Sequence, residues 1–530
     1  MFCFYSEINK TTSKSTIKMN KKKVIIIGGG ISGLTAGIYL LDNNFDVTIY
    51  EKHSIPGGEC TGWYRNNSYI DGCAHWIVGT NPKDKLYKLW EHIGAFDQNS
   101  VIYDMEYLSK FECGDKMYTL YSDIKKLKQE LLSISKEDKR QINKLITLIK
   151  LFSYTTIPTH KPIDMMNIFE LIAFGIRFLP MALAFRKYSR MSIQEFTRRF
   201  KSPVIRDILH RWMNKEYKMS SFLYVLQEAN KNNAGVVKGG SLQMSKRITV
   251  RFKELGGNII YNSEVKKIVI ENNIAKGIIL GSDEKVEADY IIPSCDIHHT
   301  FYDLLDDKFT PDYFKKKFSA LDKNPLNSAV YVSYKVLKDI SNLPKMVDYK
   351  TEGLSFENMK LPHFQVRNYS FDETYIDKNG TLITIILPTN DKFYQIIKEK
   401  NKAEYNQMKN DIASTLKNIL IEKMNLKENE IVLMDIATPL TYERYANAYH
   451  GSYMAFVSMP KSKGLMQKGE IKNLKNLIVA GQWLMPPGGL PIALFLGKHA
   501  AQRVCRLEKK VFINKEKDSN IYNVVKKKAV

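Results

Sequence analysis

Apolar residues recur along the chain either in short runs and alternation, which predict strands, or at the three- to four-residue spacing that predicts helices. Residues 24–27 form a short apolar run that predicts a buried strand, and a glycine turn, a helical stretch and a second strand ending at Glu51 follow. Residues 59–80 predict a hairpin or loop, and 121–232 are mostly helical in pattern. The further strands that we expect are 258–261, 265–271, 275–280, 288–292, 326–338, 381–388 and 474–480. The further helices that we expect span about 237–255, 391–424 and 491–507.

The turn after the first strand carries three glycines with the spacing G-x-G-x-x-G. Gly28 permits a tight turn, Gly30 lets the backbone approach a pyrophosphate, and Gly33 lets the helix lie close to the strand. Phosphates would then lie at a helix N-terminus, where free N–H groups favour negative charge. Glu51 has the place of a carboxylate that accepts from a ribose hydroxyl. An ordinary glycine-rich loop would not need this strand, helix and acid, so the motif predicts a bound dinucleotide.

The motif fits both NAD and FAD, and the residues after Glu51 favour FAD. Gly57 and Gly58 follow the acid within a few positions. A pair of glycines there lets the backbone run along the cofactor without a Cβ in the way. We therefore expect FAD.

The composition is that of a globular protein with two or more domains. The chain has 530 residues, of which 44% are hydrophobic and 25% charged. A formal net charge of +23 invites a nucleic-acid interpretation, but Lys and Asn are abundant everywhere without a single basic stripe, so we expect no nucleic-acid partner. The charge would also help the protein to lie on an anionic lipid surface.

The cysteines and the N-terminal residues suggest a cytoplasmic protein. The six cysteines include no Cys-x-x-Cys, which suits a reducing cytosol and indicates no zinc site. The first 20 residues are polar and contain no apolar secretory segment. Met19 lies just before the first strand, so residues 1–18 are either a disordered extension or the product of a misassigned start.

Four groups of residues together resemble one family of flavoenzymes. They are 28–33 with Glu51 and the glycine pair, 238–241 with 262–265, 437–445, and 480–483 with 487–491. On these motifs the chain is similar to the phytoene desaturase family of FAD-dependent oxidoreductases, a branch of the flavin amine oxidase superfamily. The family includes carotenoid desaturases, carotenoid isomerases and retinol saturases. The third group is the most family-specific, because neither FAD binding nor strand patterning requires it.

The resemblance implies which residues hold FAD. Val265 would pair with the adenine through its backbone, although a plain strand valine has the same appearance. Gly481 and Gln482 would lie near the diphosphate and ribityl groups, and residues 490–492 under the isoalloxazine ring. A helix that begins near Pro491 would point its positive end at the flavin. The full expected set is Gly28, Gly30, Ile31, Ser32, Gly33, Glu51, Lys52, Gly57, Gly58, Glu59, Val265, Gly481, Gln482, Leu490, Pro491 and Ile492.

Two of these positions depart from the family pattern. Many relatives carry Asp where Gln482 stands, so its contact with a ribityl hydroxyl would lack charge assistance. Some flavin amine oxidases carry Arg directly after the glycine pair, where this chain has Glu59. The second departure weakens an amine oxidase interpretation more than a desaturase interpretation.

The expected fold class is α/β, with a Rossmann-like FAD-binding domain of the two-dinucleotide-binding type and an inserted α+β substrate domain. We expect the FAD-binding domain at 21–95, 233–310 and 471–508, and the substrate domain at 96–232 and 311–470. Within the latter, about 121–232 would form a helical subdomain. We expect a disordered extension at 1–20 and a charged, frayed tail at 509–530.

Residues 165–185 form an apolar stretch long enough to span a bilayer, but its two charged residues and its proline argue against spanning. Two interpretations stay open. The stretch forms either a buried helix pair or an interfacial segment that dips into lipid and admits an apolar substrate. Arg186, Lys187 and Arg190 follow, as expected for residues that face lipid head groups, so about 165–190 is the candidate peripheral membrane contact.

The flavin is expected to supply the chemistry, through hydride transfer between substrate carbon and N5. Desaturation, saturation and isomerisation of an apolar isoprenoid or polyene all fit, and the electron acceptor stays open. His75 is a candidate acid or base, against the simpler interpretation of a packed or surface histidine. Tyr442 and Arg444 could line the pocket, with a structural role for Arg444 equally open. No metal site is expected.

Two other functions stay open at this point. One is a flavin oxidase of an amine or another small substrate. The other is a non-catalytic prenyl-binding carrier of the GDP-dissociation-inhibitor type, against which the intact glycine motif and the C-terminal flavin motif argue.

Overall fold

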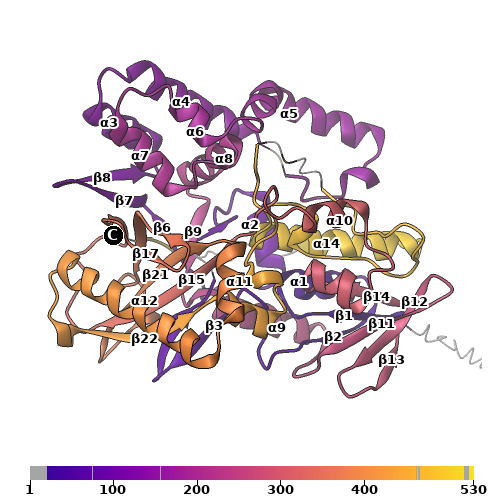
Figure 1. The fold of residues 1–530 in the computed structure, drawn as a ribbon. Helices are drawn as coiled ribbons and strands as arrows, with labels where there is room; N and C mark the ends of the chain where they lie inside the picture. Colours follow the sequence, from indigo (N-terminus) through magenta and orange to yellow (C-terminus); the bar gives the residue numbers. More distant parts are fainter. Residues whose placement is uncertain are drawn as a thin grey trace, which may run out of the picture.

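The structure is a computed structural model that describes residues 21–73, 76–155, 157–460, 462, 466–517 and 525–529. Figure 1 shows a helical layer lying over two sheet-containing parts of the molecule. The expected α/β class is confirmed.

A four-stranded parallel sheet carries the N-terminal glycine turn. Its strands are, in order, β10 (Asn258–Ile260), β2 (Asp46–Tyr50), β1 (Lys23–Ile27) and β14 (Tyr290–Pro293). Helix α1 (Ile31–Asp42) connects β1 to β2, as the sequence pattern predicts. The strand predicted at 474–480 runs beside β14 through single bridges, such as Ile291 with Leu477, rather than a continuous ladder.

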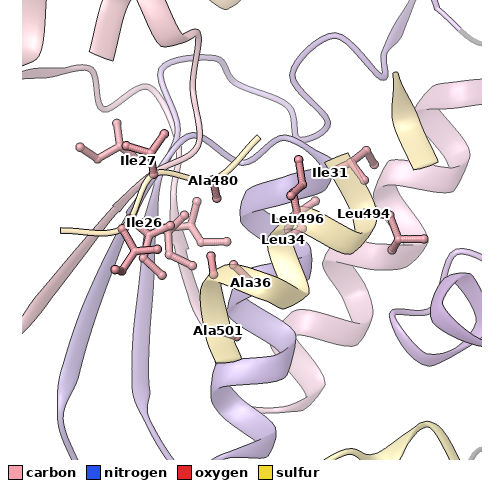
Figure 2. Close-up of a cluster of buried hydrophobic side chains, with 14 of the residues drawn as sticks. Ile26, Ile27, Ile31, Leu34, Ala36, Ala480, Leu494, Leu496 and Ala501 are labelled. Carbon is pink, nitrogen blue, oxygen red and sulfur yellow. The ribbon is translucent and has the colours of Figure 1, made fainter. Parts of the chain in front are cut away.

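Close packing of α1 against its neighbours explains the glycines behind the turn. Figure 2 shows side chains of β1, α1 and α14 (Leu490–Leu507) gathered in one buried cluster. A Cβ at Gly33 would lie 2.2 Å from the carbonyl oxygen of Gly28, and one at Gly497 would lie 2.4 Å from that of Ser32. Only glycine lets the turn and the two helices approach this closely.

The elements between 240 and 287 follow the predicted pattern closely. They are α9 (Gly240–Glu254), β11 (Val265–Glu271) and β12 (Ile274–Leu280), and a short strand that the sequence pattern did not predict, β13 (Lys285–Glu287), follows them. Asn272 and Asn273 join β11 to β12 with φ angles of 51° and 60°, which asparagine tolerates better than most residues. β11, β12 and β13 form a small antiparallel sheet beside the parallel sheet, where β12 contacts β14.

A larger, mostly antiparallel sheet forms the second part. Its strands are, in order, β22 (Ile431–Ala437), β15 (Ser328–Val336), β21 (Gly380–Thr389), β19 (His363–Asn368), β16 (Met346–Lys350), β7 (Tyr107–Cys113) and β8 (Lys116–Tyr121). All nine residues of β15 are buried, because residues such as Val332 face one hydrophobic cluster and Tyr331 faces another that includes Tyr442. This central strand therefore has no solvent-facing side.

The single helix predicted at 391–424 is wrong in one respect. The segment forms two helices, α11 (Asp391–Glu399) and α12 (Lys402–Lys423). Asn401 separates them, because its side chain accepts from the N–H groups of Ala403 and Glu404 and so caps α12.

Six helices and a hairpin account for most of the remaining predictions. The helices are α3 (Ile124–Ile134), α4 (Lys139–Leu151), α5 (Ile168–Tyr188), α6 (Ile193–Thr197), α7 (Pro203–Trp212) and α8 (Met219–Asn230), which form the upper layer in Figure 1. The predicted hairpin consists of β3 (Gly62–Arg65) and β4 (Ser68–Asp71).

Helix α5 is a single, largely exposed helix, so the alternative of a buried helix pair is wrong. Pro180 lies inside it without ending it. Its outward apolar side chains include Phe169, Leu179 and Leu183, which are 78%, 70% and 82% exposed. Among the described residues it is the one helix that is long and apolar enough to cross a membrane.

The described residues of the C-terminal tail are packed rather than frayed. Glu516 accepts hydrogen bonds from Tyr39 of α1 and Lys498 of α14, and Lys498 is itself buried. Further on, β23 (Val525–Ala529) pairs in parallel with β6 (Val101–Met105). The expectation of a frayed tail is therefore wrong for these residues, because the tail supplies partners for a buried cation and a sheet edge.

Candidate functional site

One cavity of about 1490 Å³ collects segments from distant parts of the chain. The predicted cofactor residues that line it are Gly28, Gly30, Ile31, Ser32, Glu51, Lys52, Gly57, Gly58, Glu59, Val265, Gly481, Gln482, Leu490, Pro491 and Ile492. Gly33 is the exception, since it lies behind the turn against Gly28 and Ser294. The structure thus brings the N-terminal and C-terminal motifs to the same space.

The N-terminus of α1 faces this space with unused polar groups. Gly30 is the N-cap residue and has no side chain to cap the helix. The hydroxyl of Ser32 is buried without a hydrogen-bond partner in the described part of the chain. A Cβ at Gly30 or Gly481 would meet no protein atom nearer than 3.8 Å or 4.0 Å, so both backbones border open space. This arrangement fits a phosphate-bearing group such as the FAD diphosphate.

Glu51 holds the turn from the end of β2. Its Oε2 accepts from the N–H of Gly29 at 2.6 Å, and its Oε1 accepts from the N–H of His53 at 2.7 Å. Burial raises the pKa of this carboxyl, although the two backbone N–H groups act in the opposite direction. Each oxygen keeps a lone pair, so the group can still accept from a ribose hydroxyl.

The two residues that depart from the family pattern contact each other. Gln482 Nε2 donates to Glu59 Oε2 at 2.9 Å, and Gln482 Oε1 accepts from the N–H of Gly489 at 2.7 Å. Burial, followed by repulsion from Asp296, raises the pKa of Glu59 to about 8. The raised pKa favours the neutral form of Glu59 at pH 7, and Gln482 gives it a partner that accommodates either protonation state, whereas an aspartate would repel the ionised form.

Asp296 is a site residue that the sequence analysis missed. It lies shortly after β14 and lines the cavity, and it accepts from the N–H groups of His298, His299 and Tyr449 at 2.7, 3.2 and 3.1 Å. Burial raises its pKa to about 6 despite these bonds. The available signal was its position, because ligands of open α/β sheets bind beyond the carboxyl ends of parallel strands.

Helix α14 begins at the cavity wall, as predicted. Leu490, Pro491 and Ile492 form its first turn and line the cavity, and Gly489 precedes them with a φ of 103°. No acidic residue lies in this first turn. The positive end of the helix dipole therefore faces the cavity without a neutralising side chain.

The other end of the cavity is apolar and reaches α5. Its walls include Phe152, Ile157, Pro158, Ile163, Phe174, Phe178, Phe185, Met213, Tyr224 and Val225. Phe174 and Phe178 belong to the half-buried face of α5, opposite the most exposed side chains of that helix, and Phe185 lines the cavity near the end of the helix while staying 38% exposed. The same cavity therefore joins the cofactor motifs to a long apolar compartment.

Three further predictions have different outcomes. His75 lies outside the described residues. Tyr442 and Arg444 are not among the cavity-lining residues; instead Tyr442 is buried and donates to the carbonyl oxygen of Gly72 at 2.7 Å. Among the described residues no group of His, Cys, Asp or Glu side chains is arranged to hold a metal ion.

Comparison with known proteins decides the family. The family described as "Flavin containing amine oxidoreductase" matches residues 31–505. The chain belongs to this family. Its cofactor is FAD, and it is an FAD-dependent oxidoreductase of the carotenoid desaturase-like branch. The resemblance seen in the sequence is thereby confirmed.

Curated relatives match nearly the whole length at low identity. The chain is 23% identical over 509 residues to a 4,4'-diapophytoene desaturase (4,4'-diapolycopene-forming) of Methylomonas sp, which covers 89% of this chain and 93% of that protein. It is 22% identical over 536 residues to a 4,4'-diaponeurosporene oxygenase of Staphylococcus haemolyticus, covering 93% and 99%.

Solved structures share the fold. A putrescine oxidase variant matches with a TM-score of 0.61 and 13% identity, covering 92% of this chain and 99% of that chain. A cyclohexylamine oxidase from Brevibacterium oxydans matches with a TM-score of 0.56 and 13% identity, covering 93% and 100%. At this identity the likeness shows the amine oxidase fold alone.

Proposed function

We propose that this enzyme desaturates, saturates or isomerises carbon–carbon bonds of an apolar isoprenoid or polyene. The observation that carries the proposal is the continuous cavity, which has the cofactor motifs at one end and the aromatic inner face of α5 at the other. A long apolar molecule would fill the α5 end and reach the cofactor with one of its bonds. The relatives named as a carotenoid desaturase and a carotenoid oxygenase support this substrate class.

FAD supplies a hydride acceptor or donor at N5 when it is bound. The residues of this chain would bind and orient the two reactants. Gly30, Ser32 and Gly481 would accommodate the diphosphate, and the first turn of α14 would stabilise negative charge on the flavin. The apolar walls exclude water from the reacting carbons.

We also propose that α5 lies in a membrane surface and admits the substrate from lipid. Two observations support this beyond the length of the helix. Its outward apolar side chains are exposed, while its inner aromatic side chains line the cavity. Arg186 and Lys187 lie in its last turn, where they would contact anionic head groups. A water-insoluble substrate would then enter without crossing water.

The test is an anaerobic titration of oxidised and of reduced protein with polyenes and retinoids. Bleaching of the oxidised flavin by substrate identifies desaturation, and re-oxidation of the reduced flavin identifies saturation. A changed product with an unchanged flavin spectrum identifies isomerisation. If no apolar compound changes either spectrum or its own structure, the proposed function is wrong.

The same titration and the absorption spectrum of the purified protein also test the amine oxidase and carrier alternatives. Bleaching by small amines but not by polyenes would favour an amine oxidase. A purified protein without flavin absorption would favour a non-catalytic carrier. We prefer the polyene because the cavity of about 1490 Å³ continues from the cofactor motifs along the aromatic face of α5, which is more apolar space than a small amine would fill.

A further inference from the structure

The apolar compartment contains a group of polar side chains that the proposed chemistry leaves unused. Lys218, Ser220 and Ser221 lie at the N-terminus of α8 and line the cavity. Arg190 lines the same cavity. A bridge between Ser192 and Lys218 places the chain after α5 beside the start of α8, so Arg190 and this helix terminus border one region.

The cations of this group have no carboxylate partner within the part of the chain that the structure describes. Lys218 Nζ donates to the carbonyl oxygen of Ser462 at 3.1 Å. Burial and repulsion from Lys317 lower the pKa of Lys218. A partly buried ammonium group with one neutral partner keeps donors free and lacks a compensating charge.

Ser220 is the second, independent sign of a ligand. It is only 6% exposed, and its hydroxyl has no hydrogen-bond partner among the described residues. Ser220 also lines the cavity, so a hydroxyl without a protein partner lies at the border of cavity space. In the first turn of α8 the N–H of Met219 donates to the carbonyl oxygen of Met191 and that of Ser221 to the carbonyl oxygen of Lys218. The N–H of Ser220 is the first-turn amide for which the described residues supply no acceptor.

We propose that this helix terminus, with Lys218, Ser220 and Arg190, binds a carboxylate at one end of the substrate. The substrate is then an apolar polyene with an anionic end rather than a pure hydrocarbon. A hydrocarbon would cover Lys218 and Ser220 without replacing their water, whereas a carboxylate accepts from both and is favoured by the helix dipole. This inference rests on the proposed function, because it assigns the far end of the same substrate.

The test compares two ligands that share a polyene and differ in charge. All-trans-retinoic acid and all-trans-retinol are titrated into detergent-solubilised holoprotein, and binding is read from the fluorescence of Trp76 and Trp483, which line the cavity. We expect the acid to bind at least about tenfold more tightly than the alcohol. Lys218→Met should remove this preference and leave retinol binding within about twofold, because the variant keeps the apolar stem.

Lys317→Met is the matched control. Lys317 lies close enough to lower the pKa of Lys218 but does not line the cavity, so this variant should keep the preference for the acid. Ser220→Ala is a second variant and should reduce the preference several-fold. If Lys218→Met does not retain flavin, Ser220→Ala tests the carboxylate site in its place.

The outcomes distinguish a failure of the proposed carboxylate site from a failure of the proposed polyene function. Equal affinity for the acid and the alcohol in the unaltered protein, or an undiminished preference in both cavity variants, overturns the carboxylate site and leaves the polyene function intact. Absence of binding by either retinoid, together with no flavin response to polyenes, overturns the function itself. If Lys218→Met instead loses binding to phosphatidylserine vesicles in parallel with the acid, the site belongs to lipid phosphate and the inference is wrong.

Discussion

At the end of the cavity beside α1, glycines expose the main chain, whereas the end beside α5 is formed mainly by apolar side chains, with Arg190, Lys218 and Ser220 as polar exceptions. At the first end, Gly30 and Gly481 expose backbone to the cavity, and Glu51 is bound by two backbone N–H groups. At the second end, Phe174 and Phe178 supply surface without a specific bond. A main-chain site tolerates few substitutions, while an apolar wall needs only volume and shape. The two ends should therefore respond differently to mutation.

The largest expected effect concerns the proposed contact of α5 with lipid. Replacing Ile176, Leu179 and Leu183 by Ser removes three side chains that are at least 66% exposed. At about 1.5 kcal/mol per side chain, binding to vesicles should fall roughly 1000-fold. The free energy of unfolding in detergent-free buffer should change by less than about 0.5 kcal/mol per site. Vesicle sedimentation and denaturant unfolding measure the two quantities.

Met181 offers the matched control on the same helix, because it is fully buried. Met181→Ser should cost about 2–4 kcal/mol of unfolding free energy, while the folded fraction still binds vesicles. Unchanged vesicle binding by the triple variant would show that α5 covers another surface.

The next prediction compares a glycine that is needed for packing, Gly33, with a glycine that borders the cavity, Gly30. A Cβ at Gly33 would lie 2.2 Å from Gly28 O and 2.5 Å from Ser294 Oγ, so Gly33→Ala should cost about 3 kcal/mol of unfolding free energy. A Cβ at Gly30 is 3.8 Å from the nearest protein atom, so Gly30→Ala should leave the apoprotein stable and weaken FAD binding instead. Chemical denaturation of apoprotein and FAD titration measure these outcomes. Equal losses of stability in both variants would contradict the division.

The same difference explains what could be predicted from sequence. The turn at 28–33 was predictable because its backbone geometry requires glycine at fixed positions. The exposure of α5 was not predictable. A long apolar stretch has the same sequence pattern whether it packs against protein or lies against lipid. Asp296 was missed because a carboxylate after a strand becomes a site residue only when distant segments, such as Tyr449, approach it. Asn401, by contrast, is a recognisable cap followed three residues later by Glu404, a local pattern that marks the start of α12 in the sequence.

A smaller effect concerns pH at the cofactor end. The pKa of Glu59 is about 8 in the folded protein and near its ordinary value of 4.5 in the unfolded chain, so the folded state binds one more proton between these values. The free energy of unfolding should therefore fall as pH rises from 5 to 7, by roughly 2 kcal/mol from this group. Glu59→Gln should remove that slope. Glu264→Gln is the control, because the pKa of Glu264 is lowered from its ordinary value of 4.5, so its contribution changes only below that pH and the variant should keep the slope between pH 5 and 7.

The smallest effect compares two helices with the same cap. Asn167 caps α5 and Asn401 caps α12, each in a capping box with a glutamate three residues later. Replacing either by Ala should cost about 1 kcal/mol. For Asn401 the loss should appear in global unfolding, because Ile412 and Leu416 fix α12 in the core.

For Asn167 the loss should remain local, because the first turn of α5 exposes Ile168 and Phe169 and has few buried contacts to couple it to the fold. Amide hydrogen exchange should therefore accelerate about fivefold over the first turn of α5 in Asn167→Ala, while the slowest amides of β15 are unchanged. In Asn401→Ala those same β15 amides should exchange faster. If exchange of the β15 amides also accelerated in Asn167→Ala, α5 would be coupled to the core more tightly than its exposed surface indicates. The two ends of the cavity would then differ in the shape of their walls but not in local stability.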